Sequence, residues 1–304
     1  MQVAQELPST RLNFVERLDL GGFSIAPTLV VLAAGMGSRF GGDKQFTTLG
    51  PGGETLMDYA IFDAARAGIA RVVLIVRPDA LHLLPALQAR YGRAVELLAA
   101  SQRLEDLPDG WSPPGGRTRP WGTAQAIWAT RSVVDGPFVV VNGDDFYGAA
   151  PYAALVAARR RNAEEWHLAG FHLRDTLSPS GPVNRAICQV DASGHLTKLE
   201  EVRGIVAAPD GEAIVSMNMW GLTPEVFPAI EAGLVAFMGR ADLTRDEYYL
   251  PEAIAEAMEG GRKVSVLPAG SDWCGVTFPD DAPAVREHLA ALATSGEYPA
   301  PLWP

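Results

Sequence analysis

A short apolar segment followed by a glycine-rich stretch constrains the fold of this chain more than any other feature. Residues 28–34 read TLVVLAA, and seven glycines follow between residues 35 and 53. An apolar run of this length is typical of a strand that is buried on both faces of a parallel sheet. Glycines let backbone N–H groups approach a phosphate closely, so the stretch after this strand is a candidate anion-binding turn.

Strand and helix patterns alternate through the first half of the chain. We expect a helix over 55–68, strands over 71–76, 94–99 and 138–141, and helices over 80–91 and 122–134. In the second half we expect strands over 167–173, 186–190, 196–199, 214–220 and 263–267, and helices over 224–237, 249–259 and 280–292. This order predicts an α/β fold: a doubly wound, Rossmann-like mixed sheet flanked by helices, with a smaller β-rich lobe.

The composition argues against several classes of function. The formal net charge of −11 makes binding to nucleic acids unexpected, because such binding requires clustered Lys and Arg. Residues 1–27 lack the basic segment and the long apolar run of a signal peptide or membrane span. The two cysteines, Cys188 and Cys274, form no CxxC motif, so we expect a reduced, cytoplasmic protein.

Two basic residues belong to the glycine-rich stretch. Arg39 and Lys44 follow Gly35, Gly37 and Ser38, so backbone N–H groups and two cations are available at one place. Such a set is suited to hold a triphosphate and to neutralise the charge that develops in phosphoryl transfer. The spacing matches neither a Walker motif nor a clean GxGxxG fingerprint. The alternative is an ordinary tight turn with exposed cations.

Two carboxylates follow the strand expected over 138–141. Asp144 and Asp145 come directly after Asn142 and Gly143, at the carboxyl end of that strand, where open α/β sheets bind their ligands. Mg²⁺ is usually held by one or two carboxylates together with substrate phosphates. The alternative is a polar turn or a helix cap. The five histidines show no ligand spacing, and we assign none of them to a metal.

A third candidate lies where a loop is expected to become a helix. Gly122 and Thr123 begin the helix predicted over 122–134. A helix N-terminus offers free N–H groups and the positive end of a dipole, which favour an anion. The alternative is that Thr123 only caps the helix.

A fourth set of polar residues lies in the second half. Glu200, Glu201 and Asn218 carry groups that hydrogen-bond to sugar hydroxyls, and the guanidinium of Arg185 suits a phosphate. Each has a structural alternative. The glutamates are also typical of a solvated strand end, and Asn218 is also typical of a buried, satisfied amide.

Several segments together resemble the sugar-1-phosphate nucleotidyltransferase family. LAAGMGSRF at 32–40, followed by Lys44, is similar to the family's LAAGxGTRL…K signature, PWGTAQA at 120–126 to its GTAxA segment, and VVNGDD at 140–145 to its metal-bearing turn. VSMNMWG at 215–221 looks like the stretch that holds a sugar-contacting Asn. The resemblance runs from about Thr28 to near the C-terminus and is closest to a bacterial branch of the family.

The resemblance implies a mechanism and assigns roles by position. An oxygen of a sugar 1-phosphate attacks the α-phosphorus of a nucleoside triphosphate and pyrophosphate leaves, as in nucleotide-sugar biosynthesis. The implied catalytic residues are Arg39, Lys44 and Asp144, with Asp144 also the Mg²⁺ ligand. The implied nucleotide-binding residues are Ala33, Ala34, Gly35, Gly37, Ser38, Gln102, Gly122 and Thr123. The implied sugar-phosphate-binding residues are Asn142, Arg185, Glu200, Glu201 and Asn218.

Two positions depart from the family pattern. The family's WxDxG carries a second metal-binding Asp, whereas Trp273 is followed here by Cys274 and Gly275. Asp272, Asp280 and Asp281 remain as substitutes, as does a metal held by Asp144 and phosphate alone. The family's Glu-Lys-Pro reads Glu-Glu-Val at 200–202, which removes the Lys expected to bind the sugar phosphate and leaves Arg185 or Arg203.

The resemblance therefore implies an enzyme that uses UTP or dTTP with a sugar 1-phosphate and Mg²⁺. Two alternatives remain: a non-catalytic nucleotide-sugar-binding regulator on the same fold, and cytidylyl-type transfer to a non-sugar phosphate such as a polyol phosphate. We expect an N-terminal extension (1–27), a nucleotide-binding core (28–160) and a sugar-phosphate-binding lobe with closing helices (161–304) in one compact unit. We expect no nucleic-acid or membrane partner. Formation of a homo-oligomer remains an open possibility.

Overall fold

A computed structural model describes residues 27–34, 47–208 and 212–303 of the chain. The predicted site residues Gly35, Gly37, Ser38, Arg39 and Lys44 lie outside the described residues. Their assignments therefore stay predictions from the sequence.

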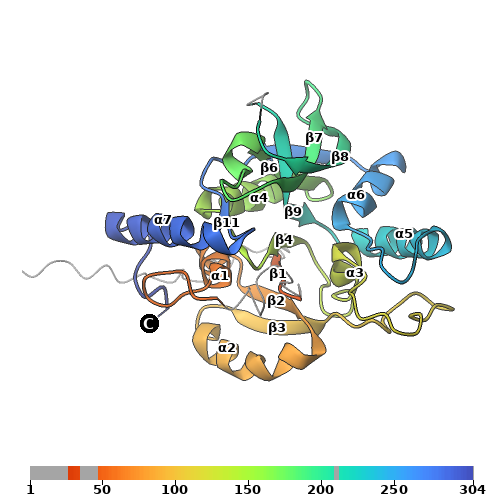
Figure 1. Ribbon diagram of the computed structural model, residues 1–304, viewed down its shortest axis with the longest axis horizontal. Helices are drawn as coiled ribbons and strands as arrows, with labels where there is room; N and C mark the ends of the chain where they lie inside the picture. The colour runs from red at the N-terminus through yellow and green to blue at the C-terminus, as the bar shows by residue number, and fades with distance from the viewer. Residues whose placement is uncertain (1–26, 35–46, 209–211, 304) are drawn as a thin grey trace, which may run out of the picture.

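A mixed sheet forms the centre of the molecule (Figure 1). Its strand order is β10-β6-β9-β4-β1-β2-β3. The bounds are β1 Thr28–Leu32, β2 Arg71–Val76, β3 Glu96–Ser101, β4 Phe138–Asn142, β6 Trp166–His172, β9 Ile214–Leu222 and β10 Val264–Pro268. β1 pairs in parallel with β2 and β4, whereas β9 runs antiparallel to both β4 and β6. The predicted α/β mixed sheet is confirmed, and it continues from the first half of the chain into the second.

Helices cover both faces of this sheet, which explains the uniformly apolar strands. Leu29, Val30 and Val31 are fully buried because alternate side chains of β1 enter two different cores. Helices α3 (Thr123–Trp128), α5 (Val226–Arg240) and α6 (Leu250–Glu259) pack on one face. Helices α1 (Leu56–Arg66), α2 (Leu84–Tyr91) and α4 (Ala149–Arg161) pack on the other, and α7 (Ala282–Ser295) packs against α1 (Figure 1).

Local signals explain most helix boundaries and two differences from the sequence prediction. α1 begins where expected, because Thr55 and Asp58 form a reciprocal capping box. α3 ends at Trp128, well before residue 134, and the Thr130 hydroxyl donates to the Ile127 carbonyl at 2.7 Å, a local bond that competes with the helix. α4 was not predicted, because its many alanines give little apolar contrast.

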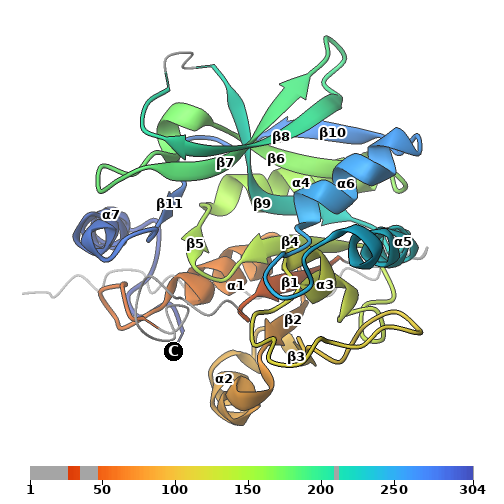
Figure 2. The ribbon, with the colours of Figure 1, turned by 45° about the vertical axis from the view of Figure 1, so that its right-hand side comes forward.

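A two-stranded arm extends from the central sheet (Figure 2). It consists of β7 (Val183–Val190) and β8 (Leu196–Ile205), and β7 also pairs with β9. This arm takes up only part of the predicted β-rich lobe, because β6, β9 and β10 belong to the central sheet, and β8 extends well beyond the predicted 196–199. Two very short strands, β5 (Asp145–Phe146) and β11 (Cys274–Gly275), pair separately in antiparallel fashion.

Candidate active site

The turn after β4 lies beside the end of β1. The Gly143 N–H donates to the Leu32 carbonyl at 3.0 Å, and a Cβ on residue 143 would stand only 3.1 Å from that oxygen. This close approach favours glycine before Asp144, which is half-buried. Asp144 is thereby held at the carboxyl edge of the sheet, next to the strand that leads into the glycine-rich stretch.

Side-chain hydrogen bonds bring two predicted acceptor-binding residues together beside a buried carboxylate. The amide of Asn142 donates from Nδ2 to Asp145 Oδ2 at 2.8 Å, and Asn218 Nδ2 lies 3.4 Å from Asn142 Oδ1. Asn218 has a φ of 58°, a left-handed conformation that is uncommon for residues other than glycine. Such conformations tend to cluster at functional sites. The sequence marks Asp145 only as a second carboxylate of the turn and indicates no role for it.

The strand pair β5–β11 places Gly275 opposite Asp145. A Cβ on residue 275 would stand 2.5 Å from Asp145 Oδ1, so the position lacking the family's Asp lies directly against another carboxylate. Of the three proposed substitutes, Asp281 is buried and accepts from the backbone N–H groups of Thr277 and Phe278 at 3.0 and 2.8 Å. Those bonds, with one from the Ser178 hydroxyl at 2.7 Å, commit its carboxylate to the local turn.

Arg185, on the arm, lies close enough to Asp145 to interact with its charge. Its guanidinium donates to the backbone and side-chain oxygens of Thr176 and to the Asn184 carbonyl, and it lies 5.4 Å from the ring centre of Trp273. Burial lowers its pKa, while the charges of Asp145 and Glu201 oppose that shift. Most donors of Arg185 are therefore engaged by the chain itself.

The two adjacent glutamates face opposite sides of the arm, because successive side chains of a strand alternate. Glu200 is exposed and pairs with Lys198 at 2.6 Å. Glu201 lines a polar pocket of about 750 Å³ together with Arg203 and Tyr249, and burial raises its pKa. The structure thus does not bring Glu200 and Glu201 into one site.

Three of the predicted nucleotide-binding residues, Ala33, Ala34 and Gln102, lie at the ends of β1 and β3. The Ala33 N–H donates to the Ile75 carbonyl at 2.9 Å, and both Ala33 and Ala34 are buried. The Gln102 side chain, just after β3, donates to the Gly122 carbonyl at 3.0 Å and to Gln125 Oε1 at 2.9 Å. Gln102 also lines a cavity of about 370 Å³ at the carboxyl ends of β2 and β3, with Arg77, Arg103, Glu105 and Thr118 among the other lining residues.

Gly122 and Thr123 have structural partners at the start of α3. Gly122 has a φ of 102°, and a Cβ there would collide with the backbone of Tyr248. The Thr123 hydroxyl accepts from the Leu250 N–H at 2.8 Å, and the Ala124 N–H donates to the Tyr248 carbonyl at 3.1 Å. The loop before α6 therefore docks on the α3 N-terminus, and a nucleotide role for these residues stays a prediction.

A buried arginine, not singled out from the sequence, joins that loop to the Pro/Gly-rich segment before α3. The Arg117 guanidinium donates to the carbonyls of Arg119, Leu243, Pro120 and Asp246 at 2.7–2.8 Å. It also stacks on the Trp121 ring, 3.6 Å from the ring centre. The charge pattern gave no signal, because an arginine in a polar loop is normally exposed.

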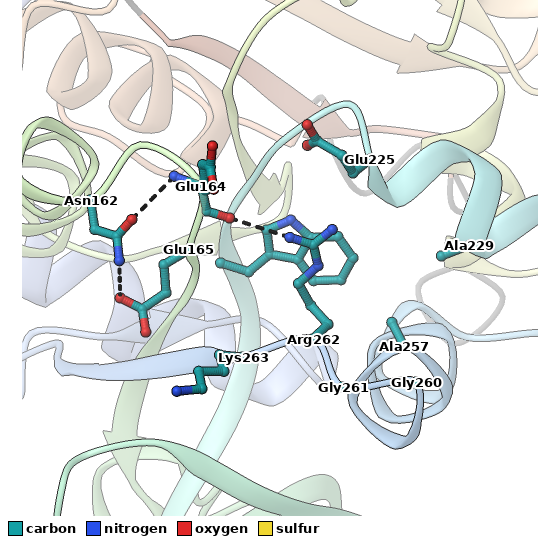
Figure 3. Close-up of a pocket in the computed structure, with 11 residues that line it drawn as sticks. Asn162, Glu164, Glu165, Glu225, Ala229, Ala257, Gly260, Gly261, Arg262 and Lys263 are labelled. Carbon is teal, nitrogen blue, oxygen red and sulfur yellow. Dashed lines mark hydrogen bonds between the residues drawn. The ribbon is translucent and has the colours of Figure 1, made fainter.

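Another pocket, of about 590 Å³, lies at the opposite edge of the sheet (Figure 3). Glu164, Glu165, Glu225, Arg262 and Lys263 contribute its charges, and Figure 3 shows Arg262 reaching across it toward Glu164. The pocket is at the amino ends of β6 and β10 and contains no predicted site residue. Its mixed charge indicates no particular ligand.

The described part of the chain contains no group of three or more His, Cys, Asp or Glu side chains arranged to hold a metal ion. An all-protein metal cage therefore does not fit these residues. The half-buried carboxylate of Asp144 does fit Mg²⁺, which commonly takes one or two carboxylates and completes its shell with substrate phosphates and water.

Comparison with known proteins supports the fold. Residues 29–101, from β1 to the end of β3, match the model of the MobA-like NTP transferase domain. The structure of the inositol-1-phosphate CTP transferase from T. maritima matches with a TM-score of 0.65 at 20% identity, over 88% of this chain and 97% of that chain. Within the described ranges, no helix has both the length and the apolar character needed to cross a membrane. Residues 29–101 are thus similar to the MobA-like NTP transferase domain, and the chain has the α/β nucleotidyltransferase fold.

Proposed function

We propose that the protein transfers a nucleotidyl group from a nucleoside triphosphate to a sugar or polyol phosphate. An acceptor phosphate oxygen bonds to the α-phosphorus, the bond from that phosphorus to the oxygen bridging the β-phosphate breaks, and pyrophosphate leaves with the bridging oxygen. The observation that carries this proposal is the position of the Asp144 turn against the end of β1, within hydrogen-bonding distance through Gly143 and Leu32. The strand β1 begins the matched domain and leads directly to Arg39 and Lys44.

The chain's own residues divide into a donor side and an acceptor side. On the donor side, Gln102 and the cavity beside it offer amide and backbone groups to a base. On the acceptor side, Asn218 offers its amide to hydroxyl groups, Asn142 lies beside it, and Arg185 adds positive charge nearby. Asp144 would hold Mg²⁺, which when bound screens the negative charge of the phosphates. Positioning and electrostatics carry most of the rate in such transfers.

Two substrate pairs are favoured by different observations. The sequence resemblance favours UTP or dTTP with a sugar 1-phosphate. The structural likeness to an inositol-1-phosphate CTP transferase favours CTP with a polyol phosphate. The missing family Lys at position 201 also favours an acceptor held differently from the usual sugar 1-phosphate.

A matrix of triphosphates and acceptors tests the proposal. CTP, UTP, dTTP, ATP and GTP are each combined with Mg²⁺ and with hexose 1-phosphates, hexosamine 1-phosphates and inositol 1-phosphate. We expect one pair to release pyrophosphate, with the matching nucleotidyl product identified by mass spectrometry. Triphosphate binding in calorimetry without turnover of any pair would favour the regulator instead. Absence of both binding and turnover would reject the proposed function.

A further inference from the structure

We propose that Asp145 is a positioning residue that acts through Asn142 to fix the direction of the Asn218 amide. In that direction, Asn218 Oδ1 accepts a hydrogen bond from a hydroxyl group of the acceptor. The inference rests on the proposed function for the identity of the ligand. The hydrogen-bond chain itself is a property of the folded protein.

The first link is set by the carboxylate. Asp145 is 7% exposed, and a carboxylate can only accept hydrogen bonds. The Tyr147 hydroxyl lies 3.3 Å from Asp145 Oδ2, but its single proton has a better acceptor in the Met217 carbonyl at 2.8 Å. Asn142 turns its Nδ2, and not its Oδ1, toward Asp145, at 2.8 Å, because two acceptors facing each other would repel. An amide alone has no preferred direction, whereas an amide beside a carboxylate does.

The second link carries this direction to Asn218. With Nδ2 committed to Asp145, the Oδ1 of Asn142 faces Asn218, whose Nδ2 lies 3.4 Å away. Asn218 Oδ1 is then left on the far side of the amide, buried and without a hydrogen-bond partner among the described residues. Buried polar atoms are nearly always hydrogen-bonded, so an orphaned acceptor on a left-handed residue points to a missing donor.

Position 275 makes room for this arrangement. A Cβ there would stand 2.5 Å from Asp145 Oδ1 and 2.7 Å from the Trp273 ring, so only glycine leaves the carboxylate in place. The pairing of Asp145 with Gly275 across β5 and β11 fixes this contact in the backbone.

The direction of the hydrogen-bond chain decides which group of the acceptor binds to Asn218. A phosphate oxygen without a proton offers no donor to Asn218 Oδ1, whereas a hydroxyl group does. Asn218 is therefore assigned to a hydroxyl of the sugar or polyol ring and not to the phosphate, and positive charge such as that of Arg185 remains for the phosphate.

The first arm of the test needs no substrate. Protein with ¹⁵N-labelled asparagine is compared as wild type and as Asp145→Asn, with Asn142→Ala and Asn218→Gly used to assign the two side-chain amide signals. Glycine suits position 218 because it tolerates the φ of 58°. We expect Asp145→Asn to shift both signals, because an amide at 145 no longer fixes the direction of the chain. A shift of the Asn142 signal alone would overturn the inference.

The matched control is Asp281→Asn. Asp281 is also a buried carboxylate with several hydrogen-bond donors, but it lies in the turn before α7. We expect this variant to lose stability and to leave both amide signals unchanged. Movement of the Asn218 signal in Asp281→Asn would show that general loosening, and not the hydrogen-bond chain, controls the amide.

The second arm is kinetic and uses the acceptor found in the substrate matrix. We expect Asp145→Asn to raise KM for the acceptor by about 10- to 100-fold, the usual effect of losing one buried hydrogen bond, with a nearly unchanged KM for the triphosphate. Wild type should disfavour an acceptor that lacks the recognised hydroxyl relative to the parent acceptor. Neither Asp145→Asn nor Asn218→Gly should discriminate between the two acceptors to the same degree. Equal effects on both KM values would overturn the positioning role. If no pair of triphosphate and acceptor is turned over, the proposed function fails. The amide signals still decide whether the hydrogen-bond chain from Asp145 through Asn142 to Asn218 exists.

Discussion

Oδ1 of Asp145 lies 2.5 Å from the point where a Cβ on residue 275 would stand. The two residues are direct partners in the β5–β11 pair, so neither can move independently of the other. The carboxylate at 145 and the missing side chain at 275 therefore belong to one arrangement. Restoring an acid at 275, as in the family pattern, would place two carboxylates in the space of one.

Gly275→Asp should consequently destabilise the protein, by about 2 kcal/mol for overpacking alone and by more if both carboxylates stay ionised. In Asp145→Ala/Gly275→Asp, removal of the Asp145 carboxylate should restore only the part of that loss that this contact causes, because the Trp273 ring still lies 2.7 Å from the Cβ. Urea unfolding measures both effects, with Gly115→Ala as the control, since a Cβ at 115 meets nothing within 4 Å. A Gly275→Asp protein as stable as wild type would show that the contact relaxes freely.

Gly122→Ala should separate the α6 loop from the N-terminus of α3. The added methyl group would collide with the Tyr248 backbone, which accepts from Ala124 and donates to Trp121. We expect a loss of at least about 3 kcal/mol from steric overlap and left-handed strain combined. Gly116→Ala is the matched control, because Gly116 also has a positive φ, 83°, but has open space around it. Equal losses in the two variants would mean that strain alone matters.

Arg117→Lys should loosen the Pro/Gly-rich segment before α3. Lysine keeps the charge, but it cannot serve four carbonyls in a plane or stack flat on Trp121. We expect a loss of about 2–4 kcal/mol in urea unfolding and faster proteolysis between residues 103 and 119. Arg119→Lys, whose side chain is exposed and pairs with Glu247 at 3.2 Å, should cost less than about 1 kcal/mol.

The stability of the protein should fall as pH rises from about 4 to 7 because of Asp63. Burial raises the pKa of this carboxyl to about 7, although the Tyr298 hydroxyl and Arg66 oppose the shift. The folded protein therefore binds a proton that the unfolded chain releases near pH 4, and stability declines wherever the folded state holds more protons. Between pH 5 and 8 the free energy of unfolding should drop by at most about 3 kcal/mol from this group.

Asp63→Asn should remove that decline, because an amide keeps the hydrogen bond with Tyr298, 2.8 Å in wild type, without titrating. Asp135→Asn, at an exposed position, should keep the wild-type slope. Urea unfolding at pH 5, 6, 7 and 8 compares the three proteins. Parallel pH profiles for wild type and Asp63→Asn would exclude Asp63 as the cause.

The sheet was predictable because its strands are buried on both faces. Segments such as 29–34 and 138–141 are apolar throughout, and that signal is local. The Asp145–Gly275 contact was not predictable, because β5 and β11 are too short to carry a pattern and lie far apart in the sequence. The role of Arg117 was not predictable for a related reason. Two of the carbonyls that accept its hydrogen bonds belong to a loop that is distant in the sequence.

In the candidate site, too, the sequence predicts local features but not contacts between distant segments. The NGDD turn was visible as polar residues at a strand end, and the resemblance supplied a role for Asp144. The direction of the Asn142 and Asn218 amides depends on hydrogen bonds between β4, β5 and β9, which no local pattern reveals. The opposite orientations of Glu200 and Glu201 follow from strand alternation, once the extent of β8 is known.

Pyrophosphate release by wild type, Lys44→Ala and Asp144→Ala, with the substrate pair found in the matrix and with Mg²⁺, tests the central claim most directly. Asp135→Ala serves as the exposed control, and circular dichroism confirms that each variant is folded. We expect wild type and Asp135→Ala to turn over at similar rates, and both Lys44→Ala and Asp144→Ala to lose activity while remaining folded. Near wild-type rates in both of those variants would contradict the assignment of this site to nucleotidyl transfer.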